Sequence, residues 1–173
     1  TCCRWSARFN AFDLLNRRLS FEGEVAVVGP LSVQLSPTWI FGTSTENLDA
    51  SGWGLGGDVG VYFGGKPLRG FWLKGHAGYE SFDATVTHPV QPKVPVTKNV
   101  SSWIVGGSIG NTTIFGDGGF ALSGGIGIGV ALADPITIVA ESKNPGIADV
   151  AAVFYDKAGS ISILGSFGLG VAF

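Results

Sequence analysis

The chain has 173 residues, a formal net charge of -2 and 14% charged residues, whereas ordinary soluble domains carry roughly 25%. Its mean hydropathy is positive at +0.34, yet charge-free stretches such as residues 99–116 are diluted by Gly, Ser, Asn and Thr, and none reads as a membrane helix. The longest basic run is Arg17-Arg18, so binding to nucleic acid has no electrostatic support. We expect a single domain over residues 1–173.

Apolar and small or polar residues alternate with period 2 along most of the chain. This is typical of β-strands whose two faces meet different surroundings. The pattern begins in residues 4–15 and recurs in 19–28, where Glu22 and Glu24 fall on the face opposite Phe21. In chain order it predicts eight strands, at residues 4–15, 19–28, 31–42, 52–64, 70–87, 99–115, 120–132 and 161–173.

The connections between these strands alternate in length. Gly29-Pro30, residues 64–69 and residues 116–119 are short turns, whereas residues 43–51, 88–98 and 133–160 are long. The first connection, only a few residues long, is the exception. We expect residues 133–160 to form a long external loop, with helical turns or strand extensions from residue 147 to 157, and residues 1–3 to form a loose N-terminal segment.

The last strand, residues 161–173, indicates what surrounds the sheet. One face carries Ile, Phe, Leu and Val, and the other carries almost nothing but Gly, Ser and Ala. A soluble sheet places charged residues on its wet face, whereas a membrane strand turns its apolar face to lipid and its small face to a crowded lumen. The sequence therefore predicts an all-β, eight-stranded antiparallel up-and-down transmembrane β-barrel.

These features resemble the small eight-stranded bacterial outer-membrane barrels of the OmpA, OmpX and OmpW kind. The resemblance rests on the alternating strands, the alternating connection lengths and a C-terminal aromatic strand. It implies a location in the bacterial outer membrane, contact with outer-membrane lipid and lipopolysaccharide, and handling by the barrel assembly machinery. The residues that resemble the assembly signal are Phe167, Leu169, Val171 and Phe173.

An eight-stranded barrel has an interior just wide enough for side chains to fill it. Buried charges persist there only when they are paired and hydrogen-bonded. We therefore predict a lumen network in which Arg8 and Lys74 neutralise some of the acidic groups. The inward-facing candidates are Arg8, Glu22, Glu24, Asp58, Lys74, His76 and Glu80.

Aromatic residues concentrate near the predicted strand ends. Membrane barrels place aromatic girdles at both interfaces, because these rings have an apolar body and, in Trp and Tyr, a polar group. The expected interface residues are Trp5, Trp39, Trp53, Phe71, Tyr79 and Phe173.

Enzymatic motifs are weak, so we expect no enzyme and no cofactor. Gly106-Gly107-Ser108-Ile109-Gly110 matches G-x-S-x-G but lies inside a strand, without the helix that this motif needs. Outer-membrane lipid-modifying barrels use His and Ser near the outer rim, which leaves His88 or His76 with Ser81 or Ser101 as an alternative. Two His and the adjacent pair Cys2-Cys3 have no metal-binding spacing, and we expect that pair to be incidental rather than lipidated or disulfide-linked.

The preferred hypothesis is a non-enzymatic outer-membrane barrel that acts through its external loops or by self-association, with a second copy or another outer-membrane protein as partner. Small outward residues such as Ala7, Gly23, Gly75 and Ala77 would allow close packing of barrels. The alternatives are an OmpW-like carrier or channel for small hydrophobic molecules, favoured by a side opening between strands, a lipid-modifying enzyme, and a soluble lipocalin-like barrel.

Overall fold

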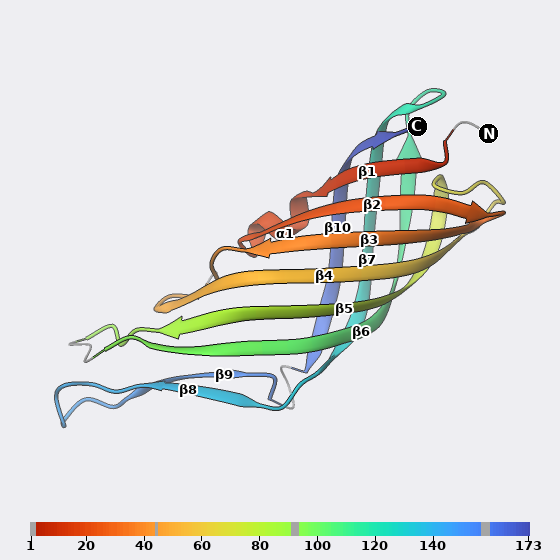
Figure 1. The fold of residues 1–173 in the computed structure, drawn as a ribbon. Coiled ribbons are helices and arrows are strands. Elements are labelled where there is room, and N and C mark those ends of the chain that lie inside the picture. Colours follow the sequence, from red (N-terminus) through yellow and green to blue (C-terminus); the bar gives the residue numbers. More distant parts are fainter. Residues whose placement is uncertain (1–2, 44, 91–93, 157–159) are drawn as a thin grey trace.

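The computed structural model describes residues 3–43, 45–90, 94–156 and 160–173, and these form a closed barrel of eight antiparallel strands (Figure 1). Around the barrel the order is β1-β10-β7-β6-β5-β4-β3-β2, so each barrel strand adjoins its neighbours in the chain, as the up-and-down prediction requires. The barrel strands are β1 (Trp5–Asn10), β2 (Arg18–Val28), β3 (Leu31–Ile40), β4 (Leu48–Tyr62), β5 (Gly70–Val86), β6 (Val96–Ile114), β7 (Gly119–Leu132) and β10 (Ile161–Ala172).

The barrel closes where its first and last strands pair. Ala7 lies opposite Val171 in the β1–β10 register, and the amides of Arg4 and Trp5 donate to the Phe173 carbonyl over 2.9 and 3.0 Å. The two chain ends therefore share one end of the barrel with the three short turns. We call this the turn end and the opposite end, which carries the longer connections, the loop end.

A short helix replaces the second half of the first predicted strand. The prediction of a strand from residue 4 to 15 was wrong beyond Asn10, because helix α1 (Ala11–Leu15) begins there. Asn10 caps this helix, since its side chain accepts a hydrogen bond from the amide of Phe12 over 3.1 Å. The adjacent pair Leu14-Leu15, which breaks the period-2 alternation, was the available signal.

The long connection between β7 and β10 contains a hairpin of β8 (Ile136–Ala140) and β9 (Val150–Phe154). Of the two alternatives predicted for residues 147–157, helical turns or strand extensions, the structure shows a strand at residues 150–154. Residues 157–159 lie outside the described residues. The hairpin runs beside the projecting loop-end parts of β5 and β6 (Figure 1). A core between them buries Ile40, Ala50, Phe82, Ala84, Val86, Val100, Ile138 and Ala140.

This second core explains why β4 and β6 are longer than expected. They begin at Leu48 and Val96, several residues before the predicted starts at 52 and 99, because their inner faces are covered by the hairpin. The sequence pattern did not predict these segments, because polar residues on their outer face, such as Asp49 and Asn99, replace the apolar residues of the alternation.

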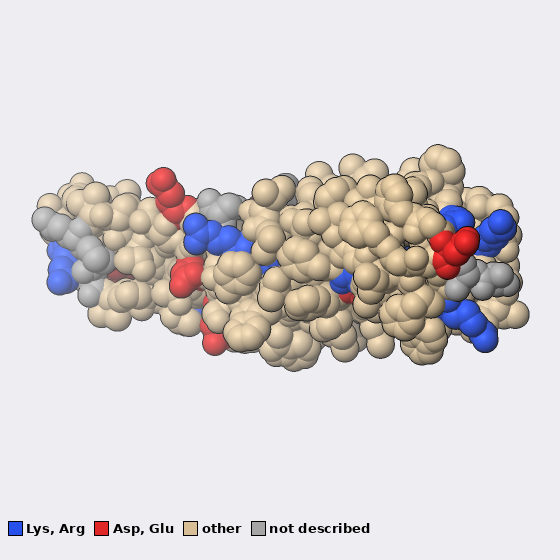
Figure 2. Space-filling model, turned by 90° about the horizontal axis from the view of Figure 1, so that it is seen from above, with Lys and Arg blue, Asp and Glu red and all other residues tan. Residues whose placement is uncertain are grey.

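The two faces of the barrel wall differ sharply. Outward-facing residues are large and apolar, and they are exposed: Trp39 is 65% exposed, Phe71 69% and Ile163 73%. Charged residues gather toward the two ends of the molecule, and uncharged residues dominate the stretch between them (Figure 2). Within the described ranges no helix is long and apolar enough to cross a membrane.

Candidate functional site in the barrel lumen

A cluster of paired charges fills the lumen near the turn end. Arg8 contacts two carboxylates, with Nη2 2.7 Å from Glu24 Oε2 and Nε 3.1 Å from Glu22 Oε2. Lys74 Nζ lies 2.9 Å from the other oxygen of Glu24. All four side chains are buried. Glu24 therefore bridges two cations that come from opposite sides of the lumen, one on β1 and one on β5.

Neutral groups complete the hydrogen bonding of this cluster. Gln34 Oε1 accepts from both Arg8 and Lys74, over 2.8 and 2.7 Å, and Ser32 and Tyr62 donate to Glu24 Oε1. Among the described residues, no buried side-chain nitrogen or oxygen lacks a hydrogen-bond partner. Buried charges satisfied in this way hold a fixed geometry, because loss of one partner would leave another charge uncompensated.

Apolar residues seal the lumen below the charge cluster. Leu68, in the turn between β4 and β5, has a φ of 63° and is 0% exposed. It packs in one core with Tyr62, Trp72 and Ile114. Cys3, expected in a loose segment and outside any disulfide, is disulfide-bonded and buried in the same core, while Cys2 lies outside the described residues. The lumen is consequently closed at the turn end.

Above the charge cluster the lumen holds a cavity of about 670 Å³. This volume lies within the usual range of small-molecule sites, roughly 300–1,000 Å³. The space exists because inward positions of β4, β5 and β10 carry Gly or Ser, including Gly54, Gly78 and Ser166. With larger inward residues, side chains would fill the interior of an eight-stranded barrel and leave no cavity.

His76 and Asp58 form a hydrogen-bonded pair on the cavity wall. His76 Nδ1 lies 2.8 Å from Asp58 Oδ1, and the imidazole is 20% exposed. Two glycines make room for the ring: a Cβ at Gly56 would lie 2.9 Å from Cε1, and one at Gly78 would lie 2.9 Å from Nε2. A carboxylate only accepts, so Nδ1 carries the proton of this hydrogen bond, and Nε2 is left to the cavity side.

Glu80 joins the barrel to the β8–β9 hairpin at the upper side of the cavity. Arg18 Nη1 lies 2.8 Å from Glu80 Oε2, and the Tyr155 hydroxyl donates to Glu80 Oε1 over 2.6 Å. Ser102 donates to the same hydroxyl over 2.9 Å. Sequence reasoning missed Arg18 and Tyr155, because one was assigned to a turn and the other to an irregular loop.

Beside this cavity, one section of the barrel wall lacks the strand pairing found elsewhere among the described strands. β10 pairs with β7 from Ile161 onward, but its register with β1 begins only at Gly168. Among the described strands, none pairs with that edge of residues 161–167, and α1 lies against it instead. The Phe12 ring packs over Gly165, where a Cβ would lie 2.5 Å from the ring.

Asn10 connects the helix to the edge of β10. Its side-chain oxygen accepts from the amides of Phe12 and Phe167, each over 3.1 Å. At this section of the wall, the helix cap and the hydrogen bond from the Phe167 amide to Asn10 take the place of the backbone hydrogen bonds between paired strands. Phe12, Asp13 and Leu164 line the cavity at this place.

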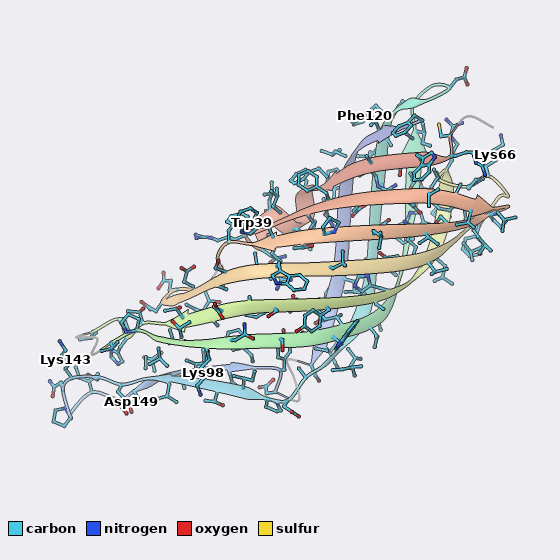
Figure 3. The ribbon with its side chains drawn as sticks, in the orientation of Figure 1. Trp39, Lys66, Lys98, Phe120, Lys143 and Asp149 are labelled. Carbon is cyan, nitrogen blue, oxygen red and sulfur yellow. The ribbon has the colours of Figure 1, made fainter. Side chains whose placement is uncertain are left out.

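The predicted interface aromatics lie on the outer wall near the two ends. Rings of Trp53, Tyr79 and Trp103 follow one another across β4, β5 and β6, with centroids 5.8 and 5.3 Å apart, and Trp39 is in register with Trp53. Trp103 was not among the predicted residues. Trp39 and Phe120 mark opposite ends of the barrel, with Lys66 at the turn end and Lys98, Lys143 and Asp149 toward the loop end (Figure 3).

The remaining aromatic and signal residues also face outward. Trp5, Phe71 and Phe173 lie exposed at the turn end. On β10, Phe167, Val171 and Phe173 are exposed on the outer face, and Leu169 is partly buried on that face. The final strand therefore presents its apolar side away from the lumen.

The structure does not assemble the alternative Ser and His candidates into one site. Ser81 and Ser101 lie opposite one another on β5 and β6, on the face that carries Tyr79, whereas His76 faces the lumen. His88 Nδ1 accepts from the Val90 amide, and Nε2 donates to the Ala148 carbonyl. Within the described part of the chain, no group of three His, Cys, Asp or Glu residues could hold a metal ion.

When the chain was compared with protein-family models, curated proteins and solved structures, no match was found.

Proposed function

We propose that the chain is a non-enzymatic barrel of the bacterial outer membrane that carries small apolar or amphipathic molecules in its lumen. The first support is the belt of exposed apolar residues on the outer wall, which the row of Trp53, Tyr79 and Trp103 borders toward the loop end. Trp53 lies within β4 and Phe63 directly follows this strand, and at ~3.3 Å per residue and a tilt of about 40° their separation gives a band roughly 25 Å tall. Membrane barrels have an apolar band of this height.

The location is tested by refolding the chain into lipid vesicles. Insertion is expected to protect the strands from protease and to give a band whose gel migration changes on heating. The matched variants Val59→Asp and Asp49→Val change one outward residue each, in the belt and at the loop end of β4. The first should impair insertion and the second should not. Equal insertion of both variants would contradict a lipid-facing belt.

The single observation that carries the second half of the proposal is a cavity bordered by a weak section of wall. This section consists of residues 161–167 of β10, with α1 lying against them. The cavity is closed at the turn end and lies against α1, where none of the described strands pairs with the β10 edge. A molecule dissolved in the bilayer would need only α1 to shift, rather than a strand ladder to break, to reach the lumen. A continuous pore has no such support, because Leu68, Tyr62 and Trp72 close the turn end.

Carriage is tested with radiolabelled dodecanol and the chain in lipid nanodiscs, with empty nanodiscs as background. Gly54→Leu is expected to abolish saturable binding, because Gly54 lines the cavity and an added Cβ meets nothing closer than 3.4 Å, so the backbone tolerates the side chain. Gly23→Leu is the matched control, since no atom lies within 4 Å of its outward Cβ position. Binding that survives Gly54→Leu unchanged would place the ligand outside the lumen.

Self-association is the second candidate, favoured by an apolar groove on the outer wall. Its lining includes Leu73, Gly107, Ile109, Ile126, Ile128 and Ile163. Gly107→Leu would fill this groove, and Gly124→Leu adds the same side chain at an open outward position. If barrels pack through the groove, analytical ultracentrifugation in mild detergent should show dimers that only the first substitution removes. A wild-type chain that stays monomeric at every concentration would exclude this candidate.

A further inference from the structure

The charges around the cavity do not balance. Among the described residues that line it or pair with its lining, three are cationic, namely Arg8, Arg18 and Lys74, and five are acidic, namely Asp13, Glu22, Glu24, Asp58 and Glu80. β3, β6, β7 and β10 contribute no charged side chain to the lining. The lumen carries an excess of two negative charges when His76 is neutral and of one when it is protonated.

Asp13 and Asp58 account for this excess, and Asp58 is the one on the wall that carries His76. Arg8 and Lys74 are engaged with Glu22 and Glu24, and Arg18 is engaged with Glu80. The structure gives Asp58 one charged partner, His76, and that imidazole is a cation only when a second proton is bound. A neutral imidazole presents Nε2 to the cavity as a hydrogen-bond acceptor. This part of the wall thus favours a group that donates hydrogen bonds and carries positive charge.

The opposite part of the cavity carries apolar residues beside Asp13 of α1. Phe12 from α1 and Leu164 from β10 line it beside the weak section of wall. These residues adjoin the outer belt, so a hydrocarbon chain lying against them would remain continuous with the bilayer interior. The cavity therefore has a polar, anionic side and an apolar side, which is the arrangement that a single-chain amphiphile requires.

We propose that the lumen selects long-chain amines, with the ammonium group beside His76 and Asp58 and the hydrocarbon chain against Phe12 and Leu164. This assignment rests on the proposed carrier function and names its ligand class. Carboxylates of the same chain length are disfavoured, because their head group would add a further negative charge to a lumen that already has an excess.

The test compares dodecylamine, dodecanol and dodecanoate in the nanodisc assay, at a pH at which the amine is protonated and the carboxylate is ionised. Saturable binding that Gly54→Leu removes is expected to be at least about tenfold tighter for the amine than for the carboxylate, as one charge at a partly buried site implies. Asp58→Asn should bring this ratio toward one. Asp117→Asn, the same change at an exposed turn, should leave the ratio unaltered.

The outcomes separate the two proposals. If none of the three probes shows lumen binding, the carrier function itself is wrong, and the ligand assignment fails with it. If all three bind with similar affinity, or the carboxylate binds best, the carrier function stands and the amine assignment is wrong. An amine preference that Asp58→Asn leaves unchanged contradicts the role of Asp58. If Asp58→Asn does not fold, the wild-type ratio alone decides.

Discussion

The Tyr155 hydroxyl donates a hydrogen bond of 2.6 Å to Glu80 Oε1, and this contact joins the β8–β9 hairpin to the barrel wall. Glu80 is also paired with Arg18, so the hairpin, β2 and β5 meet at one carboxylate. Phe154, next to Tyr155, packs against Phe82 with ring centroids 5.9 Å apart. A polar contact and an adjoining apolar one therefore help to hold the covering of the cavity at the loop end.

Removal of the Tyr155 hydroxyl should loosen the hairpin without unfolding the barrel. In Tyr155→Phe we expect amide hydrogen exchange of residues 136–140 and 150–154 to become several-fold faster, because opening no longer breaks a hydrogen bond to a carboxylate, typically worth about 1.5–3 kcal/mol. Tyr79→Phe makes the same change on the outer wall, in a tyrosine that packs between Trp53 and Trp103. Equal exchange in the two variants would mean that the apolar core alone holds the hairpin.

The same contact should depend on pH in a defined direction. Burial, and then the negative charge of Glu80, raise the pKa of Tyr155 above its usual value. The protonated phenol is the donor, so its stabilising effect is fully present below the ordinary tyrosine pKa of about 10 and is lost as pH rises through the higher folded-state value. The tyrosinate absorbance titration of wild type minus Tyr155→Phe should have its midpoint above that of free tyrosine. A midpoint at or below that of free tyrosine would contradict the contact.

Glu24 should be the most costly lumen carboxylate to remove. Its substitution by Gln leaves Arg8 and Lys74 buried without the carboxylate that both contact, and breaking a buried pair in this way typically costs about 3–5 kcal/mol. We expect a loss of this size in the free energy of unfolding, measured by urea titration in lipid vesicles. Glu46→Gln, at an exposed site in the loop between β3 and β4, should change it little. Similar losses in both variants would show that the network does not determine stability.

The sequence was sufficient for the barrel because period-2 alternation is a local signal. Each strand places residues such as Trp39 and Phe71 on one face and Ser, Gly or a charge on the other, and a shift by one residue would reverse every side chain. The eight strands and the antiparallel order follow from that alternation and from the turn residues. The alternation could not show where β1 ends, because the cap at Asn10 competes with the strand over only a few residues.

The candidate site could be predicted only in part. The alternation predicts inward charges such as Arg8 and Lys74, because they fall on a face whose other residues are mostly small and uncharged. Arg18 lies at the start of β2 and Tyr155 directly after β9, so only the three-dimensional arrangement brings both to Glu80. The cavity likewise depends on glycines of several strands coming to one level, which no single stretch of sequence reveals.

The weak section of wall leads to a prediction at Gly165. In Gly165→Ala the added Cβ would lie 2.5 Å from the Phe12 ring, so the ring must move away from β10. Such crowding typically costs about 1–3 kcal/mol. Displacing Phe12 also loosens a side chain of α1 that covers the β10 edge at this position. We expect dodecanol to exchange several-fold faster between the lumen and the bilayer, measured by release of labelled ligand from nanodiscs.

Gly124→Ala is the matched control, because Gly124 lies on β7 with no atom within 4 Å of its Cβ position. It should leave the exchange rate at the wild-type value. Phe12→Ala should accelerate exchange by itself, and Gly165→Ala in that background should add little, since the two substitutions act on one contact. Fully additive effects, or faster exchange in Gly124→Ala, would show that ligands reach the lumen elsewhere, because only passage beside α1 makes the two residues act together.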